Sequence, residues 1–173
     1  MTNHLISGET DTSLSLDELA SELRMIQSSS KRVSIIGTRN ISITHQKIVE
    51  VISLALVQAG NTVITSGGAS GVNFAAIEGA LQGDPSKLEI ILPQTLKQQP
   101  LEVQEKLKNI RVVIEHQDRV EMEFAEASRI CYNEIVDAAH QLICFLYHDS
   151  NTLAKAVEYA KINHKIVTVF YLD

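Results

Sequence analysis

Short, continuous apolar runs alternate with longer amphipathic stretches from residue 32 to residue 171. The apolar runs predict β-strands over residues 33–37, 62–65, 88–92, 111–114, 141–146 and 166–171. The stretches between them predict helices over residues 43–59, 71–82, 119–139 and 151–163, with one short helix starting near Pro100. Unbroken apolar strands indicate a sheet that is buried on both faces. Strands that are separated by helices favour parallel pairing with right-handed crossovers. The sequence therefore predicts an α/β fold, a three-layer α/β/α Rossmann-like domain with a mostly parallel sheet.

The first thirty residues differ from the rest in composition. Residues 1–13 are polar, and we expect them to be mobile. Ser15 and Glu18 have the spacing of a capping box, and apolar residues at 16, 19, 20, 23 and 26 predict a short helix with one apolar face. We expect that face to dock on the domain or on a second subunit. The predicted organisation is thus a mobile segment with one short helix over residues 1–30, followed by one domain over residues 31–173.

A glycine-rich turn joins the second predicted strand to the helix that follows it. The turn consists of Ser66, Gly67, Gly68, Ala69, Ser70 and Gly71. Its small side chains allow backbone N–H groups to approach a phosphate, and the helix start adds its positive end. An ordinary turn also uses glycine for positive φ angles, but three glycines in five residues exceed that need. The turn therefore predicts a site for a phosphate-bearing ligand, and Asn73 either contacts a ribose hydroxyl or helps to cap the helix.

Two further segments follow predicted strands and are expected at the same edge of the sheet. Gly37, Thr38 and Arg39 come directly after the first strand, where Arg39 is either a bidentate phosphate ligand or an ordinary surface charge. The second segment includes Ser150, Asn151 and Thr152, at the start of the helix after strand 141–146. Asp149 or Ser150 is expected to cap this helix. A second helix start at the same crevice would complete a two-sided phosphate clamp.

The long helix 119–139 carries polar residues that we expect beside this crevice. Tyr132, Asn133 and Glu134 form a polar edge, although Glu134 is equally well explained as a solvated helix charge. Cys131 on the same helix and Cys144 in a strand are expected to be free, buried thiols of a reducing compartment. The histidines have no partners at metal-ligand spacing, so we expect no metal, and the absence of a Gly-x-Gly-x-x-Gly motif makes a dinucleotide-binding dehydrogenase a poor fit, so we expect no cofactor.

The charge balance narrows the expected ligand. Fifteen Lys and Arg residues against twenty-one Asp and Glu residues give a formal net charge of −6, and the basic residues are scattered. Nucleic-acid-binding domains usually carry a basic balance or stripe, so the charge favours a small phosphorylated ligand. No secretory leader and no apolar run long enough to span a membrane occur, which predicts a cytoplasmic protein.

These segments together resemble the DprA/Smf family, within the Rossmann-like superfamily that also contains the LOG phosphoribohydrolases. The resemblance covers residues 32–172. Ile-Ile-Gly-Thr-Arg (35–39) is similar to the family motif after strand one, and Ile-Thr-Ser-Gly-Gly-Ala-Ser-Gly-Val-Asn (64–73) to its glycine-rich motif. Weaker similarity extends to Asn133-Glu134-Ile135 and Ser150-Asn151-Thr152. The resemblance implies single-stranded DNA binding, a RecA-type recombinase as partner and a homodimer.

Departures from the two families separate the candidate functions. LOG enzymes use a glutamate where alignment on Thr152 places Lys155, and an arginine where this chain has Tyr132. LOG-type hydrolysis is therefore not expected, and no catalytic residue is assigned. The first prediction is a non-catalytic, regulatory protein that binds a nucleotide or other phosphorylated small molecule. The alternatives are a single-stranded DNA-binding recombination mediator and, third, a LOG-like nucleoside monophosphate phosphoribohydrolase that uses Glu134 or Asp149.

Overall fold

The computed structural model describes residues 15–17 and 31–173. Leu16 and Asp17 are helical, and the rest of the helix predicted over residues 16–26 lies outside the described residues, as does the segment 1–13. Residues 31–173 form one compact unit, which is the subject of the following paragraphs.

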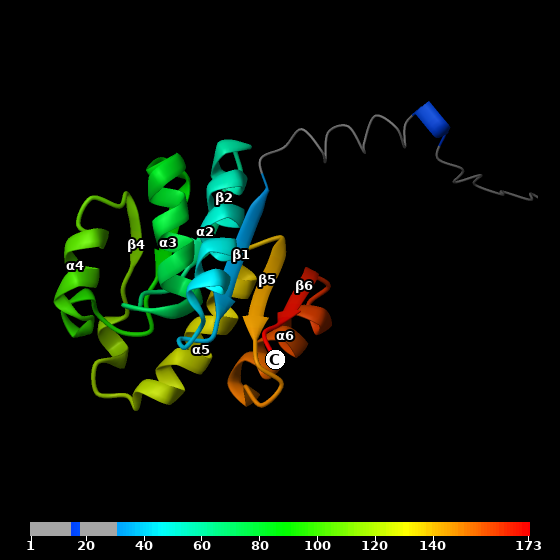
Figure 1. Cartoon of the computed structure of the whole chain (residues 1–173). Coiled ribbons are helices and arrows are strands. Elements are labelled where there is room, and N and C mark those ends of the chain that lie inside the picture. The colour runs from blue at the N-terminus through cyan, green and yellow to red at the C-terminus, as the bar shows by residue number, and fades with distance from the viewer. Residues whose placement is uncertain (1–14, 18–30) are drawn as a thin grey trace, which may run out of the picture. The chain divides into compact units, whose positions relative to one another are not determined.

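Six parallel strands and five α-helices make up this unit (Figure 1). The strands are β1 (Arg32–Gly37), β2 (Thr62–Thr65), β3 (Leu88–Ile91), β4 (Val112–Ile114), β5 (Gln141–Leu146) and β6 (Ile166–Tyr171). The helices are α2 (Ile43–Gln58), α3 (Gly71–Gly83), α4 (Leu101–Leu107), α5 (Phe124–Asp137) and α6 (Asn151–Ile162). Short 3₁₀ turns η1 (Pro85–Lys87), η2 (Leu96–Gln98) and η3 (Gln117–Arg119) lie between them. The predicted three-layer α/β/α fold is confirmed.

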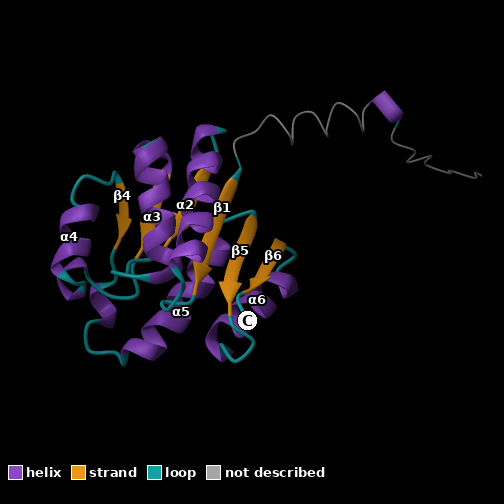
Figure 2. Ribbon diagram, viewed as in Figure 1, coloured by secondary structure: helices purple, strands orange, loops and turns teal. Residues whose placement is uncertain are grey.

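Helices cover both faces of the sheet, and each face has its own apolar core (Figure 2). Side chains of α2, α3 and α4 pack on one face around Ile35 and Ile90. Side chains of α5 and α6 pack on the other face around Ile36 and Leu142. Adjacent residues of one strand point to opposite faces, which explains why Ile35 and Ile36 belong to different cores. The unbroken apolar runs in the sequence are the signature of this double burial.

The strand order is β4-β3-β2-β1-β5-β6. The chain builds the sheet outward from β1 in one direction as far as β4, and then returns to place β5 on the other side of β1. The strand order therefore reverses between β1 and β5. In open parallel sheets, ligands bind at the carboxyl ends of the strands near such a reversal.

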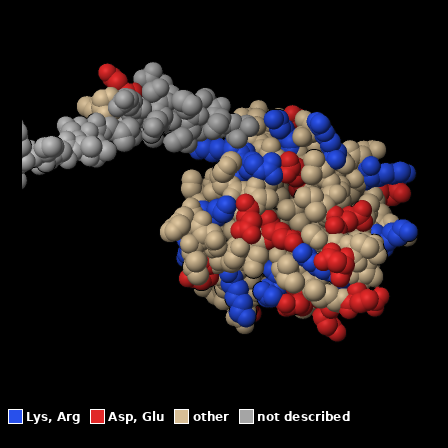
Figure 3. Space-filling model, turned by 180° about the vertical axis from the view of Figure 1, so that it is seen from behind, with Lys and Arg blue, Asp and Glu red and all other residues tan. Residues whose placement is uncertain are grey.

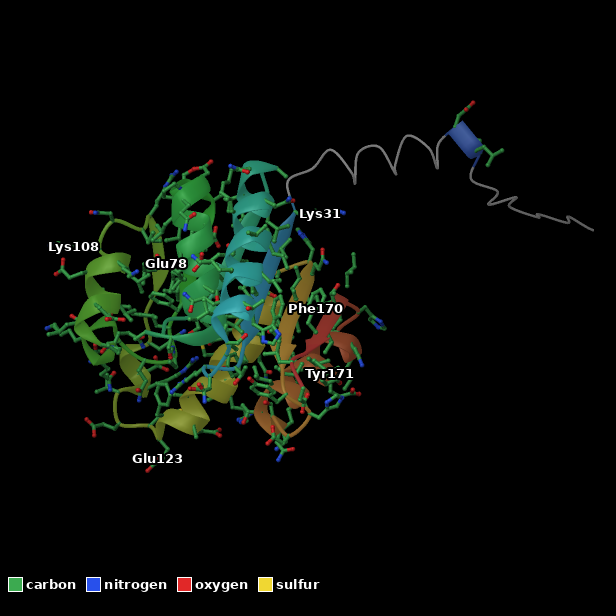
Figure 4. The ribbon with its side chains drawn as sticks, viewed as in Figure 1. Lys31, Glu78, Lys108, Glu123, Phe170 and Tyr171 are labelled. Atoms are coloured by element: carbon green, nitrogen blue, oxygen red, sulfur yellow. The ribbon has the colours of Figure 1, made fainter. Side chains whose placement is uncertain are left out.

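The outer strand β6 is less buried than the central ones. Phe170 stacks on Phe145 of β5, with 4.8 Å between ring centroids. Phe170 and Tyr171 are nevertheless exposed (Figure 4). An edge strand has a neighbour on one side alone, so part of each ring faces solvent.

The helix predicted over residues 119–139 is the one element whose start differs clearly. The structure has η3 (Gln117–Arg119), then a turn, and α5 begins only at Phe124. Gln94 explains the delay, because its side-chain amide donates to the carbonyl oxygens of Arg119 and Met122, each at 2.9 Å. Carbonyls held by a side chain of another loop do not continue a helical ladder. Glu123, directly before the helix, is labelled in Figure 4.

Candidate functional site

Two glycines bring the loop after β1 against the start of α3. Gly71 has a φ angle of +80°, and a Cβ atom there would lie 2.3 Å from the Cα of Arg39. The backbone N–H of Val72 donates to the carbonyl of Thr38 at 3.0 Å. Only glycine combines this positive φ with so close an approach. Gly71 therefore fixes where Arg39 lies relative to α3.

The end of β1 is held just as tightly on its other side. A Cβ atom at Gly37 would lie 2.4 Å from the carbonyl oxygen of Phe145. The N–H of Thr38 donates to that same oxygen at 3.0 Å. Gly37 and Thr38 thus act through their backbone: they join β1, β5 and α3, and they carry Arg39 to the edge of the sheet.

A cavity of about 290 Å³ opens at this edge. The loops after β1, β2 and β3 line it together with the first turns of α5. The lining residues are Arg39, Ser66, Gly67, Gly68, Ala69, Ser70, Asn73, Pro93, Gln98, Gln99, Pro100, Phe124, Ser128, Cys131 and Tyr132. Among these described residues Arg39 alone carries a formal charge at neutral pH. The cavity is therefore locally positive although the whole chain is acidic.

The glycine turn that lines this cavity carries unpaired backbone N–H groups. Gly68 has a φ angle of +137°, and the N–H groups of Gly68 and Ala69 make no backbone hydrogen bond within residues 31–173. Ser70 is the N-cap residue of α3, and its side chain makes no capping bond. Free N–H groups ahead of a helix start, together with the positive end of the helix dipole, favour an anion.

Asn73 adds an acceptor without a partner. Its side chain is 8% exposed, and Oδ1 is buried without a hydrogen bond among the described residues. Its Nδ2 donates weakly to the carbonyl of Gly67 at 3.4 Å. A buried polar atom that is left unpaired costs roughly 1–3 kcal/mol. A ligand with an N–H or O–H donor would relieve that cost.

Two aromatic residues, Phe124 and Tyr132, line the cavity. Phe124 is 43% exposed although it is large and apolar. The guanidinium carbon of Arg39 lies 4.9 Å from the centre of its ring, in a cation–π contact. Burial raises the pKa of the Tyr132 hydroxyl, and the Arg39 charge partly opposes that rise. The arrangement offers flat apolar faces beside one cation.

Cys131 lies at the inner wall as an inert thiol. Burial raises its pKa to about 12, although a contact with Ser66 opposes the rise. Its S–H donates to the carbonyl of Ile91 at 3.2 Å. Cys144 is also buried, with its pKa raised to about 12 for the same reason. Both cysteines are free thiols, as the sequence predicts.

The structure does not bring Glu134 to the cavity. Its carboxylate accepts hydrogen bonds from both terminal nitrogens of Arg119 and lies 3.1 Å from Nε2 of His116. The side chain of Arg119 is 11% exposed, and its bond to Glu134 raises the pKa of the guanidinium. Glu134 therefore ties α5 to the η3 segment.

The start of α6 also lies outside the cavity. Ser150 is its N-cap residue, without a side-chain capping bond, and Asn151 is exposed. Thr152 lines a separate, smaller hollow together with Asn133. The loop after β5 nevertheless contacts the loop after β1, because the Tyr147 hydroxyl donates to the carbonyl of Asn40 at 3.0 Å.

Sequence reasoning missed the contribution of the loop after β3 and of Phe124. Pro93 to Pro100 follow a buried strand, which is the signal that placed Arg39 and the glycine turn at the same edge. Phe124 gave no signal of its own, since a lone aromatic residue at a helix start is commonly packed in a core.

Comparisons with known proteins place this chain in a family. The family model of DNA recombination-mediator protein A matches residues 22–131, which is more than half of the chain. The chain belongs to the DNA recombination-mediator protein A family. The matched range includes β1, the glycine turn, Asn73 and the first turns of α5. No curated protein sequence matches the chain significantly.

Solved structures show the same fold at low sequence identity. DNA processing protein A from Helicobacter pylori, described with its single-stranded DNA binding mode, aligns with a TM-score of 0.67 and 19% identity over 84% of this chain and 67% of that one. The molybdenum cofactor binding protein from Rippkaea orientalis aligns with a TM-score of 0.62 and 17% identity, covering 84% and 79%. DprA from Streptococcus pneumoniae aligns with a TM-score of 0.50 and 15% identity, over 82% of this chain and 59% of that one. At these identities the likeness is one of fold.

Residues 15–17 and 31–173 contain neither a membrane-spanning helix nor a metal-ligand cluster. None of the helices there has the length and apolar character needed to cross a membrane. No group of three or more His, Cys, Asp or Glu side chains in these ranges could hold a metal ion.

Proposed function

We propose that this chain binds single-stranded DNA as a recombination mediator, with a backbone phosphate held at the glycine turn. One observation carries the proposal. In a member of the DNA recombination-mediator family, Arg39, Gly68 and Ala69 line one cavity at the carboxyl edge of the sheet, and the N–H groups of Gly68 and Ala69 make no backbone hydrogen bond within residues 31–173. A guanidinium and free backbone amides are the groups that bind phosphate oxygens most strongly.

The shape of the site supports a single strand. A cavity of about 290 Å³ has room for one nucleotide unit at a time. Aromatic side chains bind single-stranded bases by stacking, and Phe124 and Tyr132 both line this cavity. Their faces would hold a base whose phosphate lies at the turn.

Asn73 supports recognition of a group other than the phosphate. Its unpartnered Oδ1 accepts hydrogen bonds, and a phosphate diester offers none to donate. The N–H groups of bases do: the exocyclic amino groups of adenine, guanine and cytosine and the ring N3–H of thymine. The Asn73 side chain would therefore contact the base of the bound unit.

The charge balance favours contact with few phosphates, because fifteen Lys and Arg residues stand against twenty-one Asp and Glu residues. The face of the molecule shown in Figure 3 mixes basic and acidic side chains without one continuous basic area. One or two phosphate contacts would give a slope of log affinity against log salt of roughly −0.7 to −1.4 for a single strand. Binding is thus expected to be weaker and less salt-dependent than in a protein with a long basic groove.

A second candidate is a free nucleotide or another phosphorylated small molecule as the natural ligand, bound without catalysis in a regulatory role. The net charge of −6 favours it, as does the likeness in fold to a molybdenum cofactor binding protein. The same cavity and the same Arg39 would serve. The family resemblance also implies a homodimer and a recombinase partner, and we include both in the proposal; light scattering on the full chain tests the first.

Fluorescence anisotropy with labelled dT12 tests the proposed function. Arg39→Ala removes the only charged lining residue among those described, and is expected to weaken binding by about 10- to 100-fold, because hydrogen bonds to charged groups contribute roughly 1.5–3 kcal/mol. Arg111→Ala is the matched control. Arg111 is exposed at the amino end of β4, at the opposite edge of the sheet, and its loss is expected to change affinity less than twofold.

The outcomes separate the two candidates. Competition by dTMP that is as strong as competition by dT12 would favour the small-ligand candidate. Failure of the wild-type chain to bind dT12, or an equal loss in both arginine variants, would contradict DNA binding at this cavity.

A further inference from the structure

A second hollow, of about 110 Å³, lies between α5 and α6. Its lining residues are Arg129, Tyr132, Asn133, Thr152, Lys155, Ala156 and Tyr159. Tyr132 also lines the main cavity. The two depressions therefore adjoin, with the Tyr132 side chain between them.

The positions along α5 explain why they adjoin. Ser128 and Tyr132 line the main cavity, and Arg129 and Asn133 line the second hollow. Residues four apart lie on the same stripe of a helix, and the next residue lies about 100° further round. A ligand that leaves the main cavity over Tyr132 therefore reaches the second hollow directly.

Several polar side chains of the hollow have no partner within residues 31–173. Lys155, Asn133 and Thr152 form no side-chain hydrogen bond and no ion pair there. The other polar residues are occupied: Arg129 is bound bidentately by Glu126, and the Tyr159 hydroxyl donates to the carboxylate of Asp137 at 3.0 Å. Lys155 is thus the lysine of the hollow, and it makes no ion pair within residues 31–173.

The nearby backbone also favours binding of an anion in the hollow. Thr152 lies in the first turn of α6, where unpaired N–H groups and the helix dipole favour an anion. A lysine, two uncharged hydrogen-bonding side chains and a helix start are suited to a phosphate group. Glu126 and Asp137, the acidic partners of Arg129 and Tyr159, are each already bound.

We propose that the α5–α6 hollow is a second phosphate subsite, which binds the backbone of the same single strand next to the unit in the main cavity. This inference rests on the proposed function. The strand would pass over Tyr132, with the Lys155 ammonium on the following phosphate and the amide of Asn133 and the hydroxyl of Thr152 donating to its oxygens. Lys155 would then contribute to affinity only for an oligonucleotide long enough to reach the second subsite. Arg39 would contribute to affinity for any nucleotide unit that carries a phosphate.

A length series of oligothymidylates separates the two subsites. Lys155→Ala is expected to leave binding of dT2, which has one backbone phosphate, within twofold of wild type. The same change should weaken dT12 about five- to tenfold and make its salt slope shallower by roughly 0.7, the share of one phosphate. Lys161→Ala is the matched control, because Lys161 is an exposed lysine in the last turn of the same helix. It is expected to alter neither quantity.

The results distinguish the subsite from the main site. Wild-type binding that depends on Arg39 but shows the same dT12 affinity in the Lys155 and Lys161 variants would overturn the second subsite alone. An equal effect of Lys155→Ala on dT2 and dT12 would also overturn it, since the lysine would then act on the first unit. Absence of wild-type binding to every oligonucleotide would overturn both proposals.

Discussion

Two helices, α3 and α6, begin at the same edge of the sheet, but their surroundings differ. Each has a serine at the N-cap position whose side chain makes no capping bond. The start of α3 is preceded by a turn with positive φ at Gly68 and Gly71, and it lines the main cavity. The start of α6 follows His148 and Asp149, and its residues lie outside that cavity.

The reason for the difference is how closely the neighbouring backbone approaches. At α3 the absence of a Cβ atom at Gly71 lets the Arg39 loop lie directly against the helix. At α6 the preceding loop is occupied by other contacts. The N–H of His148 donates to the Asp173 carboxylate at 3.2 Å, and the His148 ring stacks on Tyr171 at 3.9 Å. A helix start at the ligand edge becomes part of a cavity only where the adjoining loops leave its amides open.

The largest effect is expected from closing the space at α3. Gly71→Ala places a Cβ atom against the backbone of Arg39 and Thr38 at a positive φ. Backbone strain and overpacking together are expected to lower the free energy of unfolding by about 2–5 kcal/mol. Gly60→Ala is the control, since Gly60 has a similar φ of +85° but open space around it. Gly60→Ala should lower the free energy of unfolding by about 1 kcal/mol. Urea titrations of the two variants measure both losses. Equal losses in the two variants would show that the close approach at Gly71 contributes nothing.

The second prediction concerns two buried thiols, Cys131 beside the glycine turn and Cys144 in β5. Burial raises the pKa of Cys131 and of Cys144 to about 12, whereas an unfolded thiol titrates near 8.5. The folded state therefore holds these protons more tightly. Their contribution to stability is complete below about pH 8.5 and is lost as pH rises toward 12, at up to about 1.4 kcal/mol per pH unit for each thiol.

Urea titrations between pH 8 and pH 11 measure this loss. The double variant Cys131→Ala/Cys144→Ala should show a shallower decline over that range. Rapid alkylation of the native thiols at pH 8 would contradict the burial.

The smallest effect sharpens the comparison of helix starts. Ser42 caps α2, and its hydroxyl accepts from the N–H of His45 at 3.1 Å. Ser42→Ala is therefore expected to cost about 1 kcal/mol. Ser150→Ala should cost less than about 0.3 kcal/mol, because no capping bond is lost. Thermal unfolding of the two variants measures the difference. A larger loss at Ser150 than at Ser42 would show that the side chain of Ser150 does stabilise α6.

The fold could be predicted from the sequence because burial determines which residue types occur in each strand. A parallel strand covered by helices on both faces must be apolar throughout, and runs such as 141–146 therefore matched β5 at both ends. The glycine turn was equally visible, since open backbone requires small residues. Both features depend on local sequence and not on which distant residues meet.

Features that depend on tertiary pairing could not be predicted in the same way. Glu134 resembles a solvated helix charge or a ligand contact, and its ion pair with Arg119 forms only after the η3 segment folds back on α5. The start of α5 is set by Gln94, thirty residues earlier in the sequence. The contribution of Phe124 to the cavity follows from that late start, because an earlier helix would have placed the ring elsewhere.

The most direct test of the site is an amide NMR titration of the full chain with dT12. Because the phosphate is proposed to bind the free N–H groups of the turn, the signals of Gly67, Gly68 and Ala69 should shift most, together with the Asn73 side-chain amide. Smaller shifts are expected at Asn133 and Thr152 if the second subsite is occupied. Unchanged signals in the turn, with shifts elsewhere on the molecule, would contradict the assignment of this cavity as the DNA-binding site.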